Sequence, residues 1–378
     1  MVTRTGRLQA GPGIAAQRMQ RHGWPAATRR FDLVALLLAA WVLLGGYVDG
    51  VAHVHGATDD TFFTPFHLLL YTGLLAKGLF LAGMQLRNVQ RGHSWHQALP
   101  RGYLASLAGV MLMAIGGFLD FLWHTAFGIE ADIEASVSPP HLLLACGALV
   151  FMSGPLRALW GRAEVKRGWA QLFPAIVSAL LVYSLFSLFT QFAHAISWAG
   201  QYMAGGASGE PVIQDHALTA RVLVPALLMS ATMLLLLRRW ALPFGALTFL
   251  LLGNSTLMYL LRSPDHGGSN WLVLLAALVA GLVGDLLLWR LQRPRIAAGP
   301  LRLLAFAVPL TYFVTFFVVL QLGGGIWWTT SMWTGVSVLA GAFSLGLSYV
   351  ALPPPLPAGV EPLGAAHGEQ AEGVPEGR

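Results

Sequence analysis

Charged side chains are scarce in this sequence. Of 378 residues, 17 are Asp or Glu and 23 are Lys or Arg, so 11% are charged and 56% are hydrophobic. Soluble globular proteins carry about 25% charged residues, because water must cover their surfaces. The mean hydropathy of +0.62 agrees with this deficit of charge. The composition therefore excludes an ordinary soluble domain.

Cysteine is almost absent as well. The one cysteine, Cys146, lies within an apolar run. A single cysteine excludes an intrachain disulfide framework and a thiolate-based metal site. Any metal ion bound by this chain must therefore be held by His, Asp, Glu or Met.

The basic residues form no continuous patch, although the isoelectric point is near 9.8. They occur in short clusters between apolar runs, which is typical of the cytoplasmic loops of membrane proteins. This distribution argues against nucleic acid as a partner and predicts a lipid bilayer instead. The clusters after the second and fourth apolar runs, for example, contain Arg87, Arg91 and Arg101, and Arg157, Arg162, Lys166 and Arg167.

Long apolar runs recur along the whole chain. A membrane-spanning helix needs about 20 apolar residues, and roughly ten runs meet that measure. The sequence therefore predicts an all-α, polytopic transmembrane helical bundle of about ten spans. Their approximate limits are 31–53, 62–85, 102–126, 139–160, 169–194, 214–237, 240–262, 270–290, 301–322 and 326–351.

Basic and acidic loops alternate between these runs, and basic loops remain in the cytoplasm. We therefore expect a multi-pass protein of the cell (inner) membrane with both termini cytoplasmic. The expected organisation is a basic N-terminal segment (1–30), two tandem hairpins of four spans (31–165), six further spans with degenerate repeats (166–351) and a disordered cytoplasmic tail (352–378).

The first two hairpins contain an internal repeat. Both read G-G-aromatic-x-D-x-x-x-H, followed by an acidic loop, a Pro-containing turn ending in His, and L-L-L-x-x-G. Asp49 and His53 recur 71 positions later as Asp120 and His124, and His67 recurs 74 positions later as His141. One repeat unit is therefore predicted to be a helical hairpin. The same period predicts weaker copies near His194 and His266.

Each of the first two units places an Asp and a His at positions i and i+4, on one face of a helix. The second His begins the next helix, which a short loop returns beside the first. We therefore expect two clusters near the outer surface, one of Asp49, His53 and His67, the other of Asp120, His124 and His141. Two imidazoles and a carboxylate suit a divalent first-row metal such as copper, iron or zinc.

This tandem D-x-x-x-H with a distant His resembles the C subunit of the particulate methane and ammonia monooxygenases, over about residues 31–160. The resemblance implies copper at the first set, a nearby second set, small apolar substrates and additional membrane subunits as partners. Asp120 stands where methane-oxidising members carry an amide, and the last six predicted spans have no counterpart in that family.

Other functions remain open from the residues alone. The same clusters could serve a metal-handling permease or binding protein, a b-type haem protein with paired axial histidines, a proton relay, or structural pairs. A further group of polar residues at the outer ends of later spans is predicted to anchor the helices at the interface, with a third polar cluster as the alternative. It comprises His194, Asp215, His216, Arg221, Arg262 and His266.

Overall fold

A computed structural model describes residues 23–56, 62–128, 133–163, 165–206, 211–262, 270–291 and 297–353. Residues 1–22 and 354–378, which hold most of the predicted N-terminal segment and tail, lie outside the described residues, as does His266. Within the described ranges the fold is all-α, as expected, with one isolated β-bridge between Met203 and Ile326. The helices are α1 (Arg29–Val54), α2 (Pro65–Gln90), α3 (Leu104–Phe127), α4 (Glu134–Val137), α5 (Pro139–Met152), α6 (Gly154–Trp160), α7 (Trp169–Phe189), α8 (Pro211–Arg239), α9 (Ala246–Arg262), α10 (Leu274–Leu291), α11 (Ala298–Leu322) and α12 (Thr330–Ala351).

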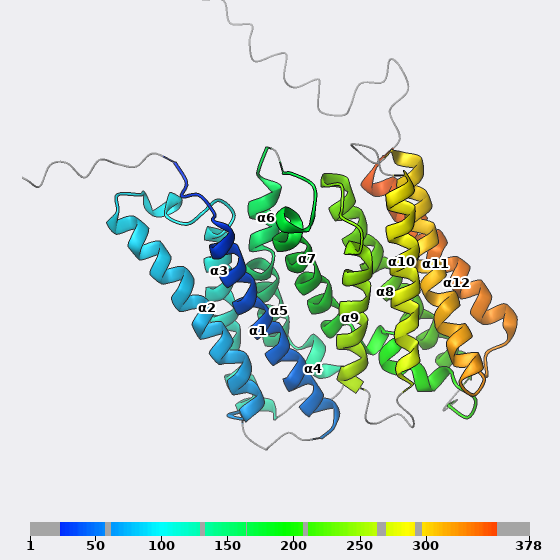
Figure 1. Ribbon diagram of the computed structural model, residues 1–378. Coiled ribbons are helices and arrows are strands. Elements are labelled where there is room, and N and C mark those ends of the chain that lie inside the picture. The colour runs from blue at the N-terminus through cyan, green and yellow to red at the C-terminus, as the bar shows by residue number, and fades with distance from the viewer. Residues whose placement is uncertain are drawn as a thin grey trace, which may run out of the picture.

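The long helices stand side by side in a row, with α2 towards one edge and α12 at the other (Figure 1). Their buried side chains form two hydrophobic clusters, one centred on α1, α2, α3 and α5 and the other on the helices from α7 onwards. Helices α7 and α9 contribute to both clusters, for example through Leu185 to the first and Leu250 to the second. The two halves of the bundle are therefore packed together through α7 and α9.

Eight helices of the described chain are long and apolar enough to cross a membrane, or nine if one bent pair counts as a single span. The chain is therefore a multi-pass membrane protein. The predicted span 240–262 corresponds to α9, which has only 17 residues, fewer than the roughly 20 needed to cross a bilayer. The predicted span 169–194 is also shorter in the structure, because α7 ends at Phe189 and short 3₁₀ turns follow.

The bent pair is α5 and α6, which together replace the predicted straight span 139–160. They meet at Ser153 with a bend of 40°. Pro155 lies in the first turn of α6, where its missing N–H is tolerated although it could not continue a regular helix. The bend follows from this local sequence.

A carboxylate fixes the start of α9. Asp285 of α10 is 1% exposed and accepts hydrogen bonds from Leu247 N at 3.1 Å, Thr248 N at 3.0 Å and Thr248 Oγ1 at 2.7 Å. The first N–H groups of a helix have no partner within that helix, so this neighbouring carboxylate acts as their cap. Helix α9 is thereby held against α10, and its other end, at Arg262, reaches towards α1.

Candidate metal centre

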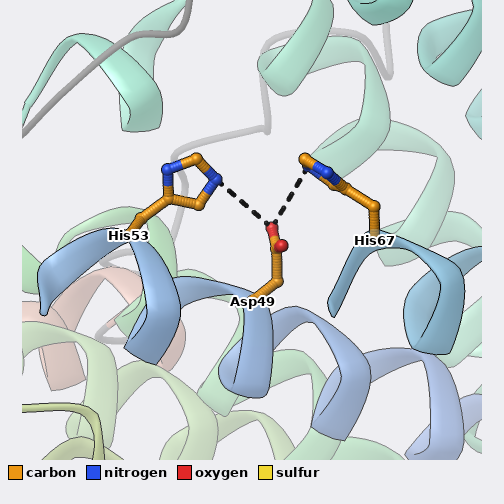
Figure 2. Close-up of side chains that lie close together, drawn as sticks. All are labelled: Asp49, His53 and His67. Carbon is orange, nitrogen blue, oxygen red and sulfur yellow. Dashed lines mark ion pairs between the residues drawn. The ribbon is translucent and has the colours of Figure 1, made fainter. Parts of the chain in front are cut away.

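The first predicted cluster forms in the structure, at the turn between α1 and α2. Asp49 and His53 lie one helical turn apart near the end of α1, and His67 lies in the first turn of α2. His53 Nε2 is 3.7 Å and His67 Nε2 3.6 Å from Asp49 Oδ2. Figure 2 shows both imidazoles directed at the carboxylate. We call these residues the first triad.

The second predicted cluster forms in the same way between α3 and α5. His124 Nε2 lies 3.5 Å and His141 Nε2 3.3 Å from Asp120 Oδ1. This second triad is more deeply buried, since Asp120 is only 1% exposed. In each triad the three ligand atoms lie within 4.8 Å of one another.

The separations fit a metal ion. Bonds of about 2.1 Å in tetrahedral geometry place neighbouring ligand atoms about 3.4 Å apart. The carboxylate-to-imidazole distances of 3.3 to 3.7 Å in the two triads bracket this value. The side chains could therefore ligate an ion with only small adjustments.

The tautomer of His124 supports the same chemistry. Its Nδ1 lies 3.1 Å from the carbonyl oxygen of Gly128. A carbonyl can only accept, so Nδ1 carries a proton, and in the neutral imidazole the lone pair is then on Nε2. That Nε2 is buried, makes no hydrogen bond, and faces Asp120. A histidine oriented through its other ring nitrogen is the usual arrangement at metal sites.

Hydroxyl groups orient the histidines that begin the second helix of each hairpin. Thr64 caps α2 by accepting from His67 N at 3.1 Å, and its Oγ1 lies 3.2 Å from His67 Nδ1. Ser138 Oγ lies 2.7 Å from His141 Nδ1 in the equivalent place. Both hydroxyl groups stand three residues before the histidine, so the local sequence of each helix start sets the ring orientation.

Glycines allow the paired helices to approach closely beside each triad. A Cβ on Gly45, four residues before Asp49, would lie 2.8 Å from Leu70 Cα. A Cβ on Gly116, four residues before Asp120, would lie 3.0 Å from Leu144 N. Leu70 and Leu144 each stand three residues after the second histidine of their triad. The two hairpins therefore share the same packing contact.

The two triads are neighbours, a proximity that the family resemblance implied but that the spacing of the residues alone did not. The His67 and His124 rings are 6.5 Å apart between centroids. Phe62 stacks on His67 at 5.0 Å and lies 6.1 Å from His124. The six side chains therefore form one continuous polar centre, with Phe62 in contact with both triads. Charge on one triad consequently affects the other.

Tyr71 is a further residue of this centre that the sequence analysis missed. It stands one turn after His67 on α2, and its hydroxyl interacts with Asp120 and lies near Asp49. Gly117 makes room for it, because a Cβ there would lie 2.6 Å from Tyr71 Cε1. The sequence signal that could have identified Tyr71 was its i+4 spacing from His67. The equivalent position in the second unit is Ala145, so the repeat did not point to it.

A cavity of about 140 Å³ opens beside the two triads. Asp49 and His53 of the first triad and His141 of the second line it. Most of the remaining wall is apolar and includes Leu43 and Leu185. The centre thus faces a small, largely apolar chamber.

The polar residues predicted at the outer ends of the later spans do not form one cluster in the structure. His194 is 2% exposed and is therefore buried, contrary to the prediction of an interfacial anchor. Burial lowers the pKa of its imidazole to about 3. Asp215 accepts a hydrogen bond from Trp328 Nε1 at 2.7 Å, whereas His216 is exposed. These three residues do not join the metal centre.

No protein-family model, curated protein or solved structure matches this chain. The assignment of the centre therefore rests on the geometry of the six side chains and on the chemistry of their donor atoms.

Proposed function

We propose that the chain is a membrane metalloprotein in which the first and second triads each hold one transition-metal ion. Copper is the leading candidate, with iron and zinc as alternatives. The observation that carries the proposal is the convergence of each triad's ligand atoms to within 4.8 Å, twice, in adjoining hairpins. Imidazole nitrogens with a carboxylate oxygen and no sulfur suit these divalent ions.

The chemistry proposed for this centre is monooxygenation of a small, largely apolar molecule. Such a reaction inserts one atom of dioxygen into a C–H bond and reduces the other to water, using two protons and two electrons from an external donor such as a quinol. A bound copper or iron ion supplies the redox chemistry. Support comes from the apolar chamber against the ligands and from the resemblance of residues 31–160 to the monooxygenase C subunit.

The residues of the chain have separate roles in this proposal. Asp49, His53 and His67 hold one ion, and the second triad holds the other. Thr64 keeps His67 in its ligating orientation. The apolar wall limits access of water and positions the body of the substrate, and the resemblance implies further membrane subunits.

The proposed location is the cell membrane, with both termini cytoplasmic and the centre near the outer surface. The first and last described helices start and finish at the same end of the bundle (Figure 1). Basic side chains at that end, such as Arg162 and Arg239, support a cytoplasmic placement. The triads lie at the opposite end, where α1 finishes and α2 begins.

The geometry favours metal ions over a b-type haem. A pocket for a drug-sized or cofactor-sized ligand measures about 300–1,000 Å³, whereas the cavity at the triads is about 140 Å³. A porphyrin would need a much larger slot. The carboxylate between each pair of histidines would also have no role in axial haem ligation.

Metal content tests the proposal directly. We would load the protein with copper in lipid nanodiscs, remove free ion, and count bound ions by mass spectrometry. The variants are His53→Ala/His67→Ala and His124→Ala/His141→Ala. The matched control is His96→Ala/His216→Ala, which removes two exposed histidines outside the centre.

The wild type and control should hold two ions per chain, and each triad variant should hold one. Equal metal content in all four proteins would show that the triads are not the sites. If no ion binds after loading with copper, iron or zinc, the triads are structural pairs or a proton relay. Oxygenation assays with added reductant are justified only if each triad variant loses one of the two ions.

A further inference from the structure

A second cavity lies at the end of the bundle opposite the metal centre. Its volume is about 380 Å³, within the range of about 300–1,000 Å³ that small-molecule sites occupy. The segment before α1, the first turn of α1, the end of α2 and the loop after α2 supply its lining. These elements meet at the end of the bundle that is uppermost in Figure 1. The cavity is therefore separate from the two triads.

The described residues that line this cavity include three basic ones and no acidic one. The basic residues are Arg87, Arg91 and His93. Arg87 and Arg91 are four positions apart at the end of α2, so they share one face of the helix. Both side chains are exposed, and neither forms an ion pair or a side-chain hydrogen bond within the part of the chain that the structure describes. Their positive charge is therefore available to a ligand.

The neighbouring sequence supplies no acid to neutralise the two arginines. Residues 1–31 and 61–119 contain neither Asp nor Glu. Asp32, which follows the first of these stretches, accepts a hydrogen bond from Tyr103 Oη at 2.6 Å and pairs with Arg162 at 3.3 Å. That carboxylate is therefore already engaged. A ligand that suits the cavity should carry negative charge of its own.

Hydrogen bonds hold the segments around the cavity together. Asn88, which is buried and lines the cavity, donates from Nδ2 to the carbonyl oxygen of Ala98 at 2.8 Å. This bond holds the loop after α2 against the helix. His93 donates from Nδ1 to the carbonyl oxygen of Gly23 at 3.2 Å, which joins the same loop to the segment before α1. The cavity is therefore built into the packing of α1, α2 and the loop.

The lining residues change from apolar to basic along α2. Met84 stands one turn before Arg87 and seven residues before Arg91, or about 10 Å at 1.5 Å per residue. Phe31, in the first turn of α1, is a further apolar residue of the lining. Apolar residues thus lie towards the middle of the spans and basic residues at their end. A phospholipid has the same order of apolar and charged groups.

Two tryptophans place the cavity at the level of lipid head groups. Trp24 directly precedes the lining residue Pro25, and Trp95 stands two residues after His93. Their side chains are 43% and 53% exposed. Exposed tryptophans at the ends of membrane-spanning helices lie at the membrane–water interface. Lipid phosphates at this interface are therefore the anions that the two arginines meet.

We propose that this cavity binds the head group of one anionic phospholipid, whose phosphate is held by Arg87 and Arg91 and whose acyl chains remain in the bilayer. Guanidinium groups pair with phosphate through two parallel hydrogen bonds. Basic pockets between membrane helices are a known way of binding anionic head groups. The inference is independent of the metal centre, because no residue of either triad lines this cavity.

The test is a lipid titration of the full-length, lipid-depleted protein in detergent, followed by native mass spectrometry. Dimyristoylphosphatidylglycerol is the anionic probe. Dimyristoylphosphatidylcholine has the same acyl chains and a head group without net charge, and glycerol 1-phosphate is the head-group anion without acyl chains. We expect one saturable phosphatidylglycerol adduct, with binding of each of the other two probes at least about 10-fold weaker.

The decisive variant is Arg87→Gln/Arg91→Gln. Each basic residue near a membrane surface contributes about 5-fold to the binding of anionic lipid, so this variant should bind phosphatidylglycerol about 30-fold more weakly and phosphatidylcholine as before. The matched control is Arg238→Gln/Arg290→Gln, which removes two exposed arginines at the ends of α8 and α10, outside the cavity. The control should bind phosphatidylglycerol within about 2-fold of the wild type.

The lysine variant Arg87→Lys/Arg91→Lys separates charge from geometry. It keeps both charges without the planar fork, so an intermediate affinity is expected. It also replaces the glutamine variant if that protein does not fold.

Equal affinity of the wild type for the two lipids would overturn the proposal. An equal loss of phosphatidylglycerol binding in the control and in Arg87→Gln/Arg91→Gln would also overturn it, because general surface charge would then explain the effect. Binding of glycerol 1-phosphate as tight as that of phosphatidylglycerol would replace the lipid by a soluble phosphate ester.

Discussion

Substituting alanine for Gly45 tests whether the contact between α1 and α2 sets the geometry of the first triad. The added Cβ would lie 2.8 Å from Leu70 Cα and 2.9 Å from Leu70 N, whereas ordinary contacts begin near 3.4 Å. The two helices must therefore separate by at least 0.6 Å at this point, the difference between 3.4 and 2.8 Å. Both contacting atoms belong to the backbone, so no side chain can rotate away to relieve the overlap.

The displacement reaches the ligands because His67 stands three residues before Leu70 on the same helix. His67 Nε2 is 3.6 Å from Asp49 Oδ2, and a shift of this size moves it away from a shared ion. Overpacking of this kind costs about 1–3 kcal/mol of stability. By analogy with disturbed outer-shell contacts, we expect the affinity of the first triad for metal to fall by about 10- to 100-fold.

The assay is competition for zinc between the protein and a chelator of known affinity, together with the number of ions bound per chain. Gly45→Ala should lose one tight ion and retain the ion of the second triad. The control is Gly46→Ala, whose Cβ would meet only side-chain atoms, Leu188 Cδ2 at 3.7 Å and Leu70 Cδ1 at 3.9 Å. If both variants bind zinc as tightly as the wild type, helix separation does not govern the first triad and the reasoning fails.

Two further predictions concern other parts of the bundle. Burial lowers the pKa of His194 to about 3, below the roughly 6.5 of the unfolded chain, so the unfolded state takes up the proton first as pH falls. Protonation of this histidine in the unfolded state should therefore cost about 2 kcal/mol of stability between pH 7 and 5. His194→Gln should show a smaller drop in melting temperature over that range than the wild type. Equal drops in the two proteins would contradict this prediction. Asp285→Ala leaves the N–H groups of Leu247 and Thr248 without their buried acceptor, which should cost about 2–3 kcal/mol. Thermal unfolding should show the loss while metal content stays at the wild-type value, and an unchanged melting temperature would show that Asp285 does not cap α9.

Much of the centre was predictable because its first two ligands are local. Asp49 and His53 share a helix face through their i, i+4 spacing, and the short loop brings His67 back beside them. The structure confirms both triads as groups that could hold a metal ion. The repeat in the sequence also has a counterpart in structure, where Gly45 meets Leu70 and Gly116 meets Leu144.

Other features depended on contacts that hydropathy does not encode. Hydropathy alone did not show that the helix in the run 240–262 would start only at Ala246. Pro243 and Gly245 form a turn before it, and the cap comes from Asp285 on another helix. The run 139–160 is mostly apolar, so hydropathy did not reveal the bend at Ser153, which Pro155 marks in the local sequence. His194 looked interfacial because it ends an apolar run, yet it lies between two 3₁₀ turns and its side chain is buried.

The sequence by itself determined that the chain is a helical membrane protein and which six side chains could ligate a metal. These properties arise from hydrophobicity and helical periodicity, which act over a few neighbouring residues. Only the tertiary structure decided that the two triads adjoin at His67 and His124 and that Arg262 reaches their cavity. The choice of neighbouring helices in a bilayer depends on close packing at small residues such as Gly50, and that packing joins segments far apart in the chain.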